Sequence, residues 1–244
     1  MDAFQEFDQP SAPQKSTGAI ISHALETYKG VFLYALLAMV IYIVASMLIQ
    51  AISGFDSKMM MEEIRDSSGD YSSLRIWEIP GMSVYYGLSG LVGVLMAPLY
   101  VGLIYVANKY DFKEQIQISD LFIGYRQNLV NILIYSIISS IILAISFALC
   151  VLPGFFVMPL LLLGYPILLF ENASFGEAIS KSFQIAKENY GVMLGTSVLG
   201  LLISLSGILL CFVGILLTFM FFLVVMYSAY TAFLGRPKQV EFKS

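Results

Sequence analysis

The chain has 244 residues, of which 58% are hydrophobic and 12% are charged, and its formal net charge is −4. Because soluble globular domains carry about 25% charged residues, this composition excludes an ordinary soluble domain and indicates a protein that folds mainly in lipid. The sequence has no basic cluster that would indicate nucleic-acid binding. One histidine and two cysteines are too few for a multi-histidine metal centre or a disulfide framework.

Four stretches without charged residues predict the membrane-spanning helices, because a charged side chain at the bilayer centre costs about 2.5–3.5 kcal/mol on insertion scales. The stretches at 30–55 and 79–108 each have the length of one helix. Those at 127–170 and 189–235 hold 44 and 47 residues. A single helix of that length would be roughly twice as long as the hydrocarbon thickness of about 30 Å, so each must fold back as a hairpin.

We therefore predict an all-α membrane protein of six transmembrane helices in three hairpins. The sequence LPG at 152–154 is the expected turn of the second hairpin, because Pro cannot continue a helix and Gly tolerates a turn conformation. Weaker turn candidates for the third hairpin are Ser206, Gly207 and Gly214. The predicted spans are 31–52, 84–107, 129–150, 155–170, 192–210 and 212–233.

The distribution of Lys and Arg predicts the orientation of these spans. With the N-terminus in the cytoplasm, ten of the thirteen Lys and Arg residues lie inside. The other three lie in an outer loop at 54–82 that also carries six acidic residues. The positive-inside rule therefore favours N-in and C-in, in a bacterial inner membrane. We expect a disordered cytoplasmic tail at 1–15, a single six-helix membrane domain at 16–235 and a second cytoplasmic tail at 236–244.

An offset of 61 residues superposes similar residues from neighbouring parts of the chain, and several matches at one offset indicate an internal repeat. Since two spans separate equivalent positions, the repeated units share one orientation. The repeat of about 61 residues is therefore parallel, unlike the inverted repeats of many transporters. The matched pairs are Pro98 with Pro159, Phe122 with Phe183, Arg126 with Lys187, Asn128 with Asn189 and Cys150 with Cys211.

We expect an amphipathic segment before each hairpin, lying along the cytoplasmic interface. In the segment 174–190, Phe175, Ile179 and Phe183 fall on one side at helical spacing, while Lys181 and Lys187 fall on the other. Its first residues, SFGE, predict a capping box. These segments act either as plain connectors, the commoner case, or as a lipid sensor or docking surface. The other two apolar faces comprise Ile118, Leu121, Phe122, Tyr125 and Leu129, and Ile20, Ile21, Ala24, Leu25 and Tyr28.

Small residues recur at intervals of three and four on two of the predicted spans. Such faces let helix backbones approach closely, and we expect both to pack within the chain, with contact between copies as the less common alternative. Three prolines, Pro98, Pro159 and Pro166, are expected to kink their helices. The small-residue faces comprise Ser83, Gly87, Gly90, Gly93 and Ala97 on the second span, and Thr196, Gly200 and Ser204 on the fifth.

Few residues suggest chemistry, and we expect no catalytic residue, no cofactor and no metal site. The predicted spans contain no ionisable Asp, Glu, Lys, Arg or His between their ends, which weakens a role in ion-coupled transport. The nearest candidate polar cluster is Glu171 with Asn172, at the cytoplasmic end of the fourth span, although these residues equally suit a plain helix end. His23 falls on the polar side of the first amphipathic segment. Cys150 and Cys211 either pair in an oxidising compartment or act as small apolar side chains.

Several motifs carry a resemblance to a known family. They are ISHALETYKGVF near the N-terminus, PLYVG at 98–102, DLFIGYRQN at 120–128, LPG, YPILLFEN, FGEAISKSFQIAKEN and LLCFVG. Over residues 20–235 the chain resembles a group of bacterial multi-pass membrane proteins similar to the membrane domain of membrane-bound glycerophosphodiester phosphodiesterases. The catalytic domain of those enzymes has no counterpart in these residues. The resemblance therefore implies the fold and no activity, and the acidic outer loop at 54–82 departs from it.

These features favour a non-catalytic integral inner-membrane protein that acts as a scaffold or accessory subunit of a membrane complex, or that modulates local lipid. The alternative is a small transporter or lipid-handling protein with a cavity between the helix hairpins. An enzyme is a weaker third reading. The expected partners are the lipid bilayer and other membrane proteins, with no nucleic acid, and the sequence leaves the oligomeric state open.

Overall fold

The computed structural model describes residues 12–66, 75–149, 151–210 and 213–237, and the regular structure in these residues is helical. Cys150 and Cys211, together with most of both predicted tails, lie outside the described residues. The prediction of six apolar helices of spanning length is confirmed. Within the described residues they are Thr17–Ser53, Met82–Asp111, Leu129–Leu149, Leu152–Phe170, Tyr190–Leu209 and Gly214–Leu234.

The chain forms two compact units. Unit 1 comprises Met1–Met39 and Ala97–Ser244, and unit 2 comprises Val40–Met96. Two long helices, α1 (Thr17–Ser53) and α3 (Met82–Asp111), are each divided between the two units.

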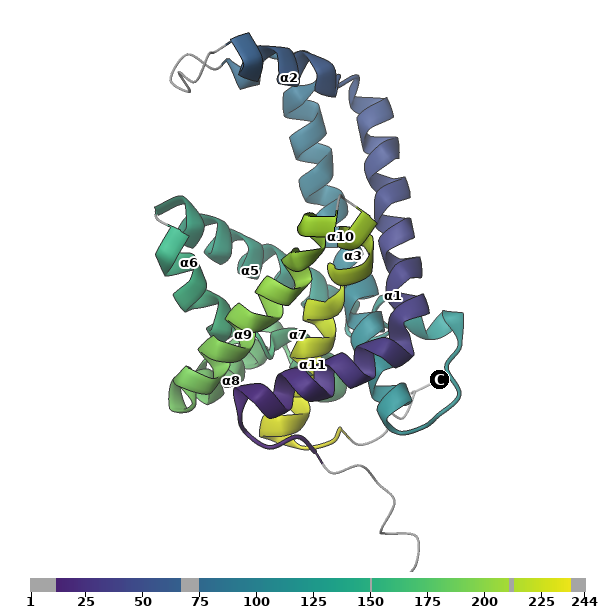
Figure 1. Cartoon of the computed structure of the whole chain (residues 1–244), viewed down its shortest axis with the longest axis vertical. Helices are drawn as coiled ribbons and strands as arrows, with labels where there is room; N and C mark the ends of the chain where they lie inside the picture. Colours follow the sequence, from purple (N-terminus) through teal and green to yellow (C-terminus); the bar gives the residue numbers. More distant parts are fainter. Residues whose placement is uncertain (1–11, 67–74, 150, 211–212, 238–244) are drawn as a thin grey trace, which may run out of the picture. The chain divides into compact units, whose positions relative to one another are not determined.

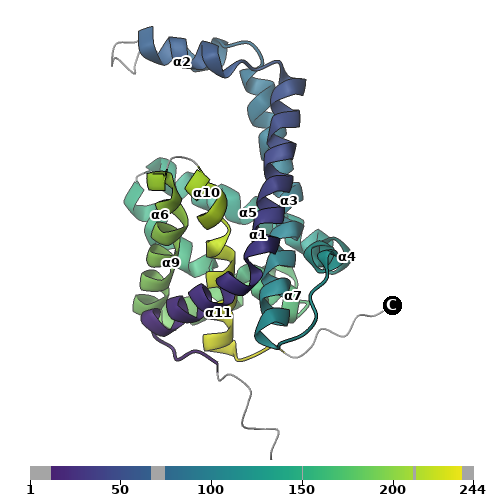
Figure 2. The same cartoon turned by 45° about the vertical axis from the view of Figure 1, so that its right-hand side comes forward.

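Unit 2 is a pair of helical segments closed by a short helical loop. Its parts of α1 and α3 run side by side in both views (Figures 1 and 2), and α2 (Ser57–Asp66) and η3 (Ile76–Glu78) connect them. Helix α2 lies within the loop predicted at 54–82. A small core holds the loop in place, formed by Phe55, Ile79 and Met82, with Met60, Ile76 and Tyr85 packed against them.

Part of the small-residue face predicted on the second span has no packing partner within unit 2. A Cβ atom added at Gly87, Gly90 or Gly93 would meet no other atom within 4 Å, so no other part of unit 2 packs on these glycines. Packing of this part of the face within the chain therefore stays a prediction.

In unit 1, the first part of α1 runs across the C-terminal helices. Thr17 Oγ1 donates to the Val192 carbonyl oxygen at 3.2 Å, and Tyr28 Oη donates to the Leu217 carbonyl oxygen at 2.8 Å. Ile20 and Ala24, on the predicted apolar face, are fully buried. Figure 1 shows this crosswise course before the helix turns. The expected first amphipathic segment therefore exists, but it is continuous with the first span instead of being a separate surface helix.

The second expected amphipathic segment is irregular. It consists of η4 (Ile118–Phe122) and α4 (Ile123–Arg126), separate from the following α5 (Leu129–Leu149). A Cβ on Gly102 would collide with the backbone of Leu121, and one on Gly124 would collide with the backbone of Pro98. This segment thus lies directly against α3, and close backbone contact, together with a left-handed Asn128 (φ 51°), replaces the regular helix predicted from spacing.

The fourth span is divided into α6 (Val151–Val157), η5 (Met158–Leu161) and α7 (Gly164–Phe170). Residues 152–154 lie inside α6, so the predicted turn at this position is wrong. Pro is compatible with the first turn of a helix, where its missing N–H has no partner to lose. The glycine has a packing role instead, because a Cβ on Gly154 would strike the ring of Phe147 on α5.

The C-terminal part contains α8 (Phe175–Glu188), α9 (Tyr190–Leu205), η6 (Ser206–Leu210), α10 (Val213–Thr218) and α11 (Phe221–Leu234). The capping box predicted at the start of α8 is confirmed, with Glu177 N–H donating to Ser174 Oγ at 3.3 Å. Helix α8 buries Ala178, Ser182 and Ala186. These small residues let it pack closely on η5, where Ser182 Oγ donates to the Leu160 carbonyl oxygen at 2.7 Å.

Helix α11 forms the centre of unit 1, and most of its side chains are buried. It packs against α7 and α9. The second small-residue face is used as predicted, since Thr196, Gly200 and Ser204 are buried. A Cβ on Gly200 would lie 3.1 Å from Val225 of α11, so this glycine sets the spacing between the two helices.

Candidate functional site

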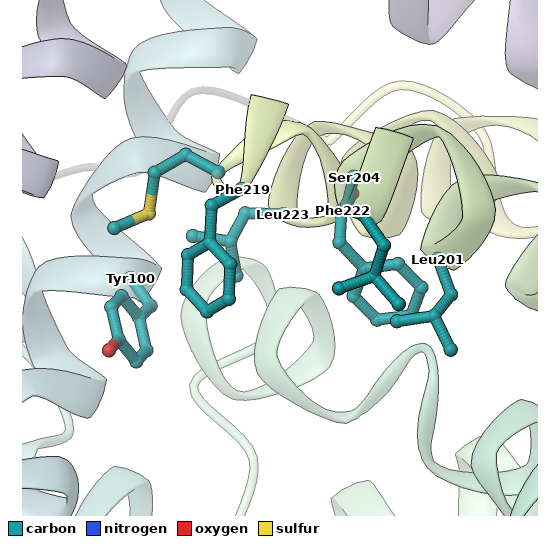
Figure 3. A pocket seen from close by; sticks show the side chains of 8 residues that line it. Tyr100, Leu201, Ser204, Phe219, Phe222 and Leu223 are labelled. Atoms are coloured by element: carbon teal, nitrogen blue, oxygen red, sulfur yellow. The ribbon is translucent and has the colours of Figure 1, made fainter. Parts of the chain in front are cut away.

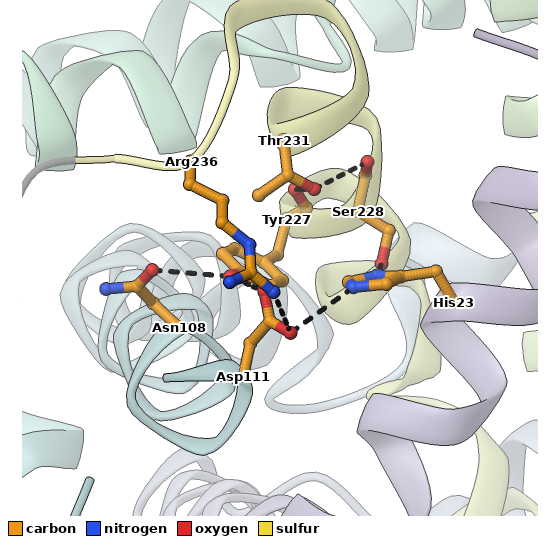
Figure 4. Close-up of polar contacts among 7 residues, drawn as sticks. All are labelled: His23, Asn108, Asp111, Tyr227, Ser228, Thr231 and Arg236. Atoms are coloured by element: carbon orange, nitrogen blue, oxygen red, sulfur yellow. Dashed lines mark hydrogen bonds and ion pairs between the residues drawn. The ribbon is translucent and has the colours of Figure 1, made fainter. Parts of the chain in front are cut away.

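A cluster of polar side chains is buried where the start of α1 and the ends of α3 and α11 meet. Its centre is Asp111, whose side chain is 7% exposed. Arg236 Nη2 lies 3.0 Å from Asp111 Oδ1, and Tyr227 Oη donates to Oδ2 at 2.8 Å. Figure 4 shows these side chains converging on the carboxylate. One carboxylate therefore joins elements that are 116 and 125 residues apart in the chain.

His23 completes this Asp111 cluster from the start of α1. Its Nε2 lies 3.5 Å from Asp111 Oδ1, and its Nδ1 lies 2.9 Å from Ser228 Oγ. The neutral tautomer that satisfies both contacts carries its proton on Nε2 and accepts a hydrogen bond from Ser228. The histidine that the sequence placed on the polar side of a surface helix is therefore mostly buried, with its side chain 15% exposed.

Ser228, His23 and Asp111 are the residue types of a serine hydrolase triad, but their arrangement does not suit that chemistry. In such triads the serine contacts Nε2 and the acid contacts Nδ1, whereas here the nitrogens are exchanged. Ser228 is also fully buried in the middle of α11, so a substrate carbonyl has no route to its hydroxyl. The contacts hold three helices together and leave no free nucleophile.

Arg236 is held by more than its ion pair. Its guanidinium carbon lies 5.2 Å from the centre of the Phe112 ring, in cation–π geometry. Its side chain is 14% exposed, and the buried Nε has no hydrogen-bond partner. Burying this donor without a partner costs free energy. The ion pair with the carboxylate of Asp111 is therefore the main interaction that offsets the cost of burying the guanidinium.

A second charged cluster lies on the neighbouring turn of α11. Lys181 Nζ lies 2.6 Å from Glu171 Oε2, and Tyr230 Oη donates to Glu171 Oε1 at 3.2 Å. The ring of Phe170 contacts both Tyr227 and Tyr230, so the same helix face organises both clusters. A third pair, Lys109 with Asp120 at 2.9 Å, joins the end of α3 to η4.

The structure places the predicted pair Glu171 and Asn172 in different roles. Glu171 forms the cluster just described. Asn172 adopts a left-handed backbone conformation with φ 49°, directly after the end of α7, which is a common way to terminate a helix. Both residues line an open polar hollow of about 490 Å³ that also includes Lys181 and Glu177.

The residues predicted to line the interfacial helix α8 divide between two environments. Phe183 and Lys187 are exposed, whereas Phe175, Ile179 and Lys181 are half-buried. Glu177 accepts a hydrogen bond from the Ser174 backbone N–H, which lowers the pKa of its carboxyl group below the usual value. A large aromatic side chain thus stays on the surface of α8 while small residues form its packed face.

An apolar cavity lies deeper in unit 1, between α3, α9 and the junction of α10 with α11. It has a volume of about 220 Å³. Figure 3 shows Tyr100 of α3 on one side, Phe219 and Leu223 in the middle, and Phe222 beside Ser204 and Leu201 on the other side. The hydroxyl of Ser204 is already used, since it donates to the Gly200 carbonyl oxygen at 2.8 Å. The lining therefore offers hydrocarbon and aromatic contacts.

In the described part of the chain, no three His, Cys, Asp or Glu side chains gather in a way that could hold a metal ion. Comparison with known proteins gives no family: no family model, no curated protein and no solved structure matches the chain.

Sequence reasoning missed the Asp111 cluster. The partners lie far apart in the chain, and His23, Asp111 and Arg236 each precede or follow a predicted span in the way that residues at ordinary helix ends do. One signal was available: Asp111 directly follows a predicted span on the side where His23 and Arg236 were also placed. An acid at that end, among the Lys and Arg residues of the cytoplasmic side, was a candidate for pairing.

Proposed function

We propose that the chain is a non-catalytic, multi-pass protein of the bacterial inner membrane that acts as a scaffold or accessory subunit of a larger membrane complex. The observation that carries the proposal is the exposed surface of α2 in the outer loop. Met59 and Met61 are 47% and 71% exposed there, although α2 is too polar and too short to cross lipid. Methionine-rich exposed surfaces suit adaptable contacts with other proteins.

The charge of the same loop indicates the chemical character of the partner. Glu62, Glu63 and Asp66 lie beside these methionines on α2, and the loop as a whole carries six acids against three basic residues. Complementary charge steers association and selects partners. The fitting partner is therefore a protein segment that combines apolar side chains with positive charge.

The pairing of the charged groups in unit 1 supports a role without catalysis. Asp111, Glu171 and Asp120 each engage a basic side chain within 3.0 Å. A catalytic acid or base must be within reach of its substrate, and these carboxylates are occupied in holding helix ends together.

The proposed orientation is N-in and C-in, with the three amphipathic segments in the cytoplasmic interface. Each segment leaves a large apolar side chain exposed outside the six spans predicted from the sequence: Leu25, Phe122 and Phe183. Such groups suit the boundary between headgroups and acyl chains. We also propose the parallel repeat, with support from one matched contact: Gly102 abuts Leu121, and Leu163 N–H donates to Ser182 Oγ at 3.2 Å. Both partners of the second contact lie 61 residues after those of the first. The similarity to the membrane domain of glycerophosphodiester phosphodiesterases stays a prediction.

The alternative function, transport or lipid handling, has one observation in its favour. It requires a cavity between helices, and unit 1 contains one. A path for ions would need polar or charged lining groups, whereas this cavity is lined mainly by apolar side chains. It therefore favours lipid handling over transport of a polar solute.

A photo-cross-linking experiment in native membranes tests the scaffold proposal. A photoreactive amino acid at Met61 should give one discrete adduct, and the same group at Ile141, an exposed position on α5, should give none. The adduct should weaken at high salt and disappear in an E62K/E63K variant, because the contact depends on charge. Recovery of the protein alone from the Met61 position, or an adduct that survives charge reversal, would contradict the proposal.

A further inference from the structure

We propose that the apolar cavity between α3, α9 and the α10–α11 junction binds one acyl chain of a membrane phospholipid. This inference rests on the lipid-handling alternative and is independent of partner binding by α2.

The depth of the cavity identifies its surroundings. Tyr100, Leu201 and Leu223 each lie eleven residues from the end of their helix at the charged face of unit 1, at Asp111, Tyr190 and Leu234. At 1.5 Å per residue, each lies about 16 Å from that face. Half of the hydrocarbon thickness is about 15 Å, so three independent helices place the cavity near the centre of the bilayer.

The cavity has a buried floor and an exposed rim. Ser204, Met220 and Leu223 are buried and form the floor, while Leu205 and Phe219 are exposed and form the rim. Leu202 of α9 and Leu217 of α10, on the helices that border the cavity, are also exposed. The mouth of the cavity is thus continuous with a surface of large apolar side chains. At this depth in the bilayer, lipid acyl chains contact that surface.

The size and lining fit hydrocarbon better than water. An apolar cavity of about 150 Å³ stays dry and binds benzene, and this one is larger, at about 220 Å³. A buried water needs two to four polar partners, whereas the lining side chains carry two hydroxyl groups, those of Tyr100 and Ser204, and the Ser204 proton is already donated to the Gly200 carbonyl oxygen. An acyl chain leaves one apolar environment for another, so retention depends on the fit of dispersion contacts against Phe219 and Phe222.

A break in the last span borders the cavity. Helix α10 ends at Thr218 and α11 begins at Phe221. Thr218 Oγ1 donates across to the Ser204 carbonyl oxygen at 2.7 Å, which holds the break open beside α9. The two residues between the helices, Phe219 and Met220, then line the cavity instead of filling it.

Photolabelling with a phosphatidylglycerol that carries a diazirine in its acyl chain tests this site in the purified, detergent-solubilised protein. As lipid is added, labelling of the peptide around Phe219 should saturate at about one lipid per protein, while labelling around the lipid-facing residues Leu33 and Ile141 should rise in proportion to lipid. Lipids at a general surface exchange and show no such saturation. Equal, unsaturated labelling of all three regions of the wild-type protein would by itself overturn the proposal.

Two neighbouring substitutions provide a matched comparison. Leu201→Trp adds bulk inside the cavity, and Leu202→Trp adds the same bulk on the exposed side of the same helix. We expect L201W to lower the saturable labelling by about tenfold, since a filled cavity excludes the chain, and L202W to change it less than twofold. Equal loss in both variants would overturn the proposal. Displacement of the label by an isoprenoid alcohol but not by unlabelled phospholipid would also overturn it. Either result leaves the cross-linking test of α2 unaffected, so failure here is distinct from failure of the scaffold proposal.

Discussion

Replacing Asp111 by Asn should destabilise unit 1 strongly, because the substitution keeps the volume of the side chain and removes its charge. Arg236, 14% exposed, would then be a buried cation without a counterion. Breaking a buried ion pair by removing one partner costs about 3–5 kcal/mol. Since Tyr227 can still donate to the amide oxygen, we expect the lower end, about 3 kcal/mol. For a chain of this size that corresponds to a melting temperature lower by about 6–12 °C.

Thermal unfolding of the purified protein in mild detergent, followed by circular dichroism or by loss of the monodisperse peak, measures this change. The control is Glu78→Gln, which removes an exposed ion pair, Arg75 with Glu78 at 3.5 Å, whose side chains are 73% and 69% exposed. It should cost less than about 1 kcal/mol. The double variant D111L/R236M should be more stable than D111N, because it removes both charges together with the unpaired Nε. A D111N protein that melts with the wild type would refute the reasoning, since Asp111 would then contribute nothing to holding the helix ends.

Three further changes test other parts of the account. Gly102→Val should lower the free energy of unfolding by about 1–3 kcal/mol, because the valine side chain would meet the Leu121 backbone. Gly176→Ala, at a helical position with open space, should not destabilise the protein. Thermal melts of the two variants will show whether the close backbone contact at Gly102 matters. Ser174→Ala should cost about 1 kcal/mol at neutral pH through loss of the α8 cap. Because hydrogen bonding, chiefly from the Ser174 backbone N–H, lowers the pKa of Glu177 in the folded protein, the contribution of this carboxylate is complete above its unfolded pKa of about 4.3 and is lost as the pH falls through the lower folded value. The difference in stability between wild type and E177Q should therefore shrink in acid, and a constant difference from pH 7 to pH 3 would count against the carboxylate as its source.

The membrane-spanning helices were predictable because a single physical term dominates their placement. The cost of a charge in hydrocarbon applies to each residue separately, so the absence of charge over a long stretch is visible without knowledge of any partner. The α8 capping box was predictable for the same reason, since Ser174 and Glu177 are three residues apart and interact locally. Both predictions needed only the sequence around the feature.

The Asp111 cluster and the path of residues 118–126 depend on partners that sequence spacing does not reveal. Apolar residues at 118–129 fit helical spacing, yet Gly102 and Gly124 allow backbone contact with α3 that changes the local conformation. Pro153 suggested a turn because it ends most helices, but at the start of α6 it has no hydrogen bond to lose. In each case a tertiary contact or a position within the helix decided between two locally acceptable conformations.

In the proposed topology, charged residues mark the ends of six spans, and the ends beside Lys113 and Lys187 share one side of the membrane. Single cysteines placed at Lys113, Lys187 and Lys58, all exposed, in a variant lacking Cys150 and Cys211, can be labelled with a membrane-impermeant maleimide before and after permeabilising cells. The account predicts that Lys58 is labelled in intact cells and that Lys113 and Lys187 are labelled only after the inner membrane is opened. Labelling of Lys113 and Lys187 from opposite sides would contradict it.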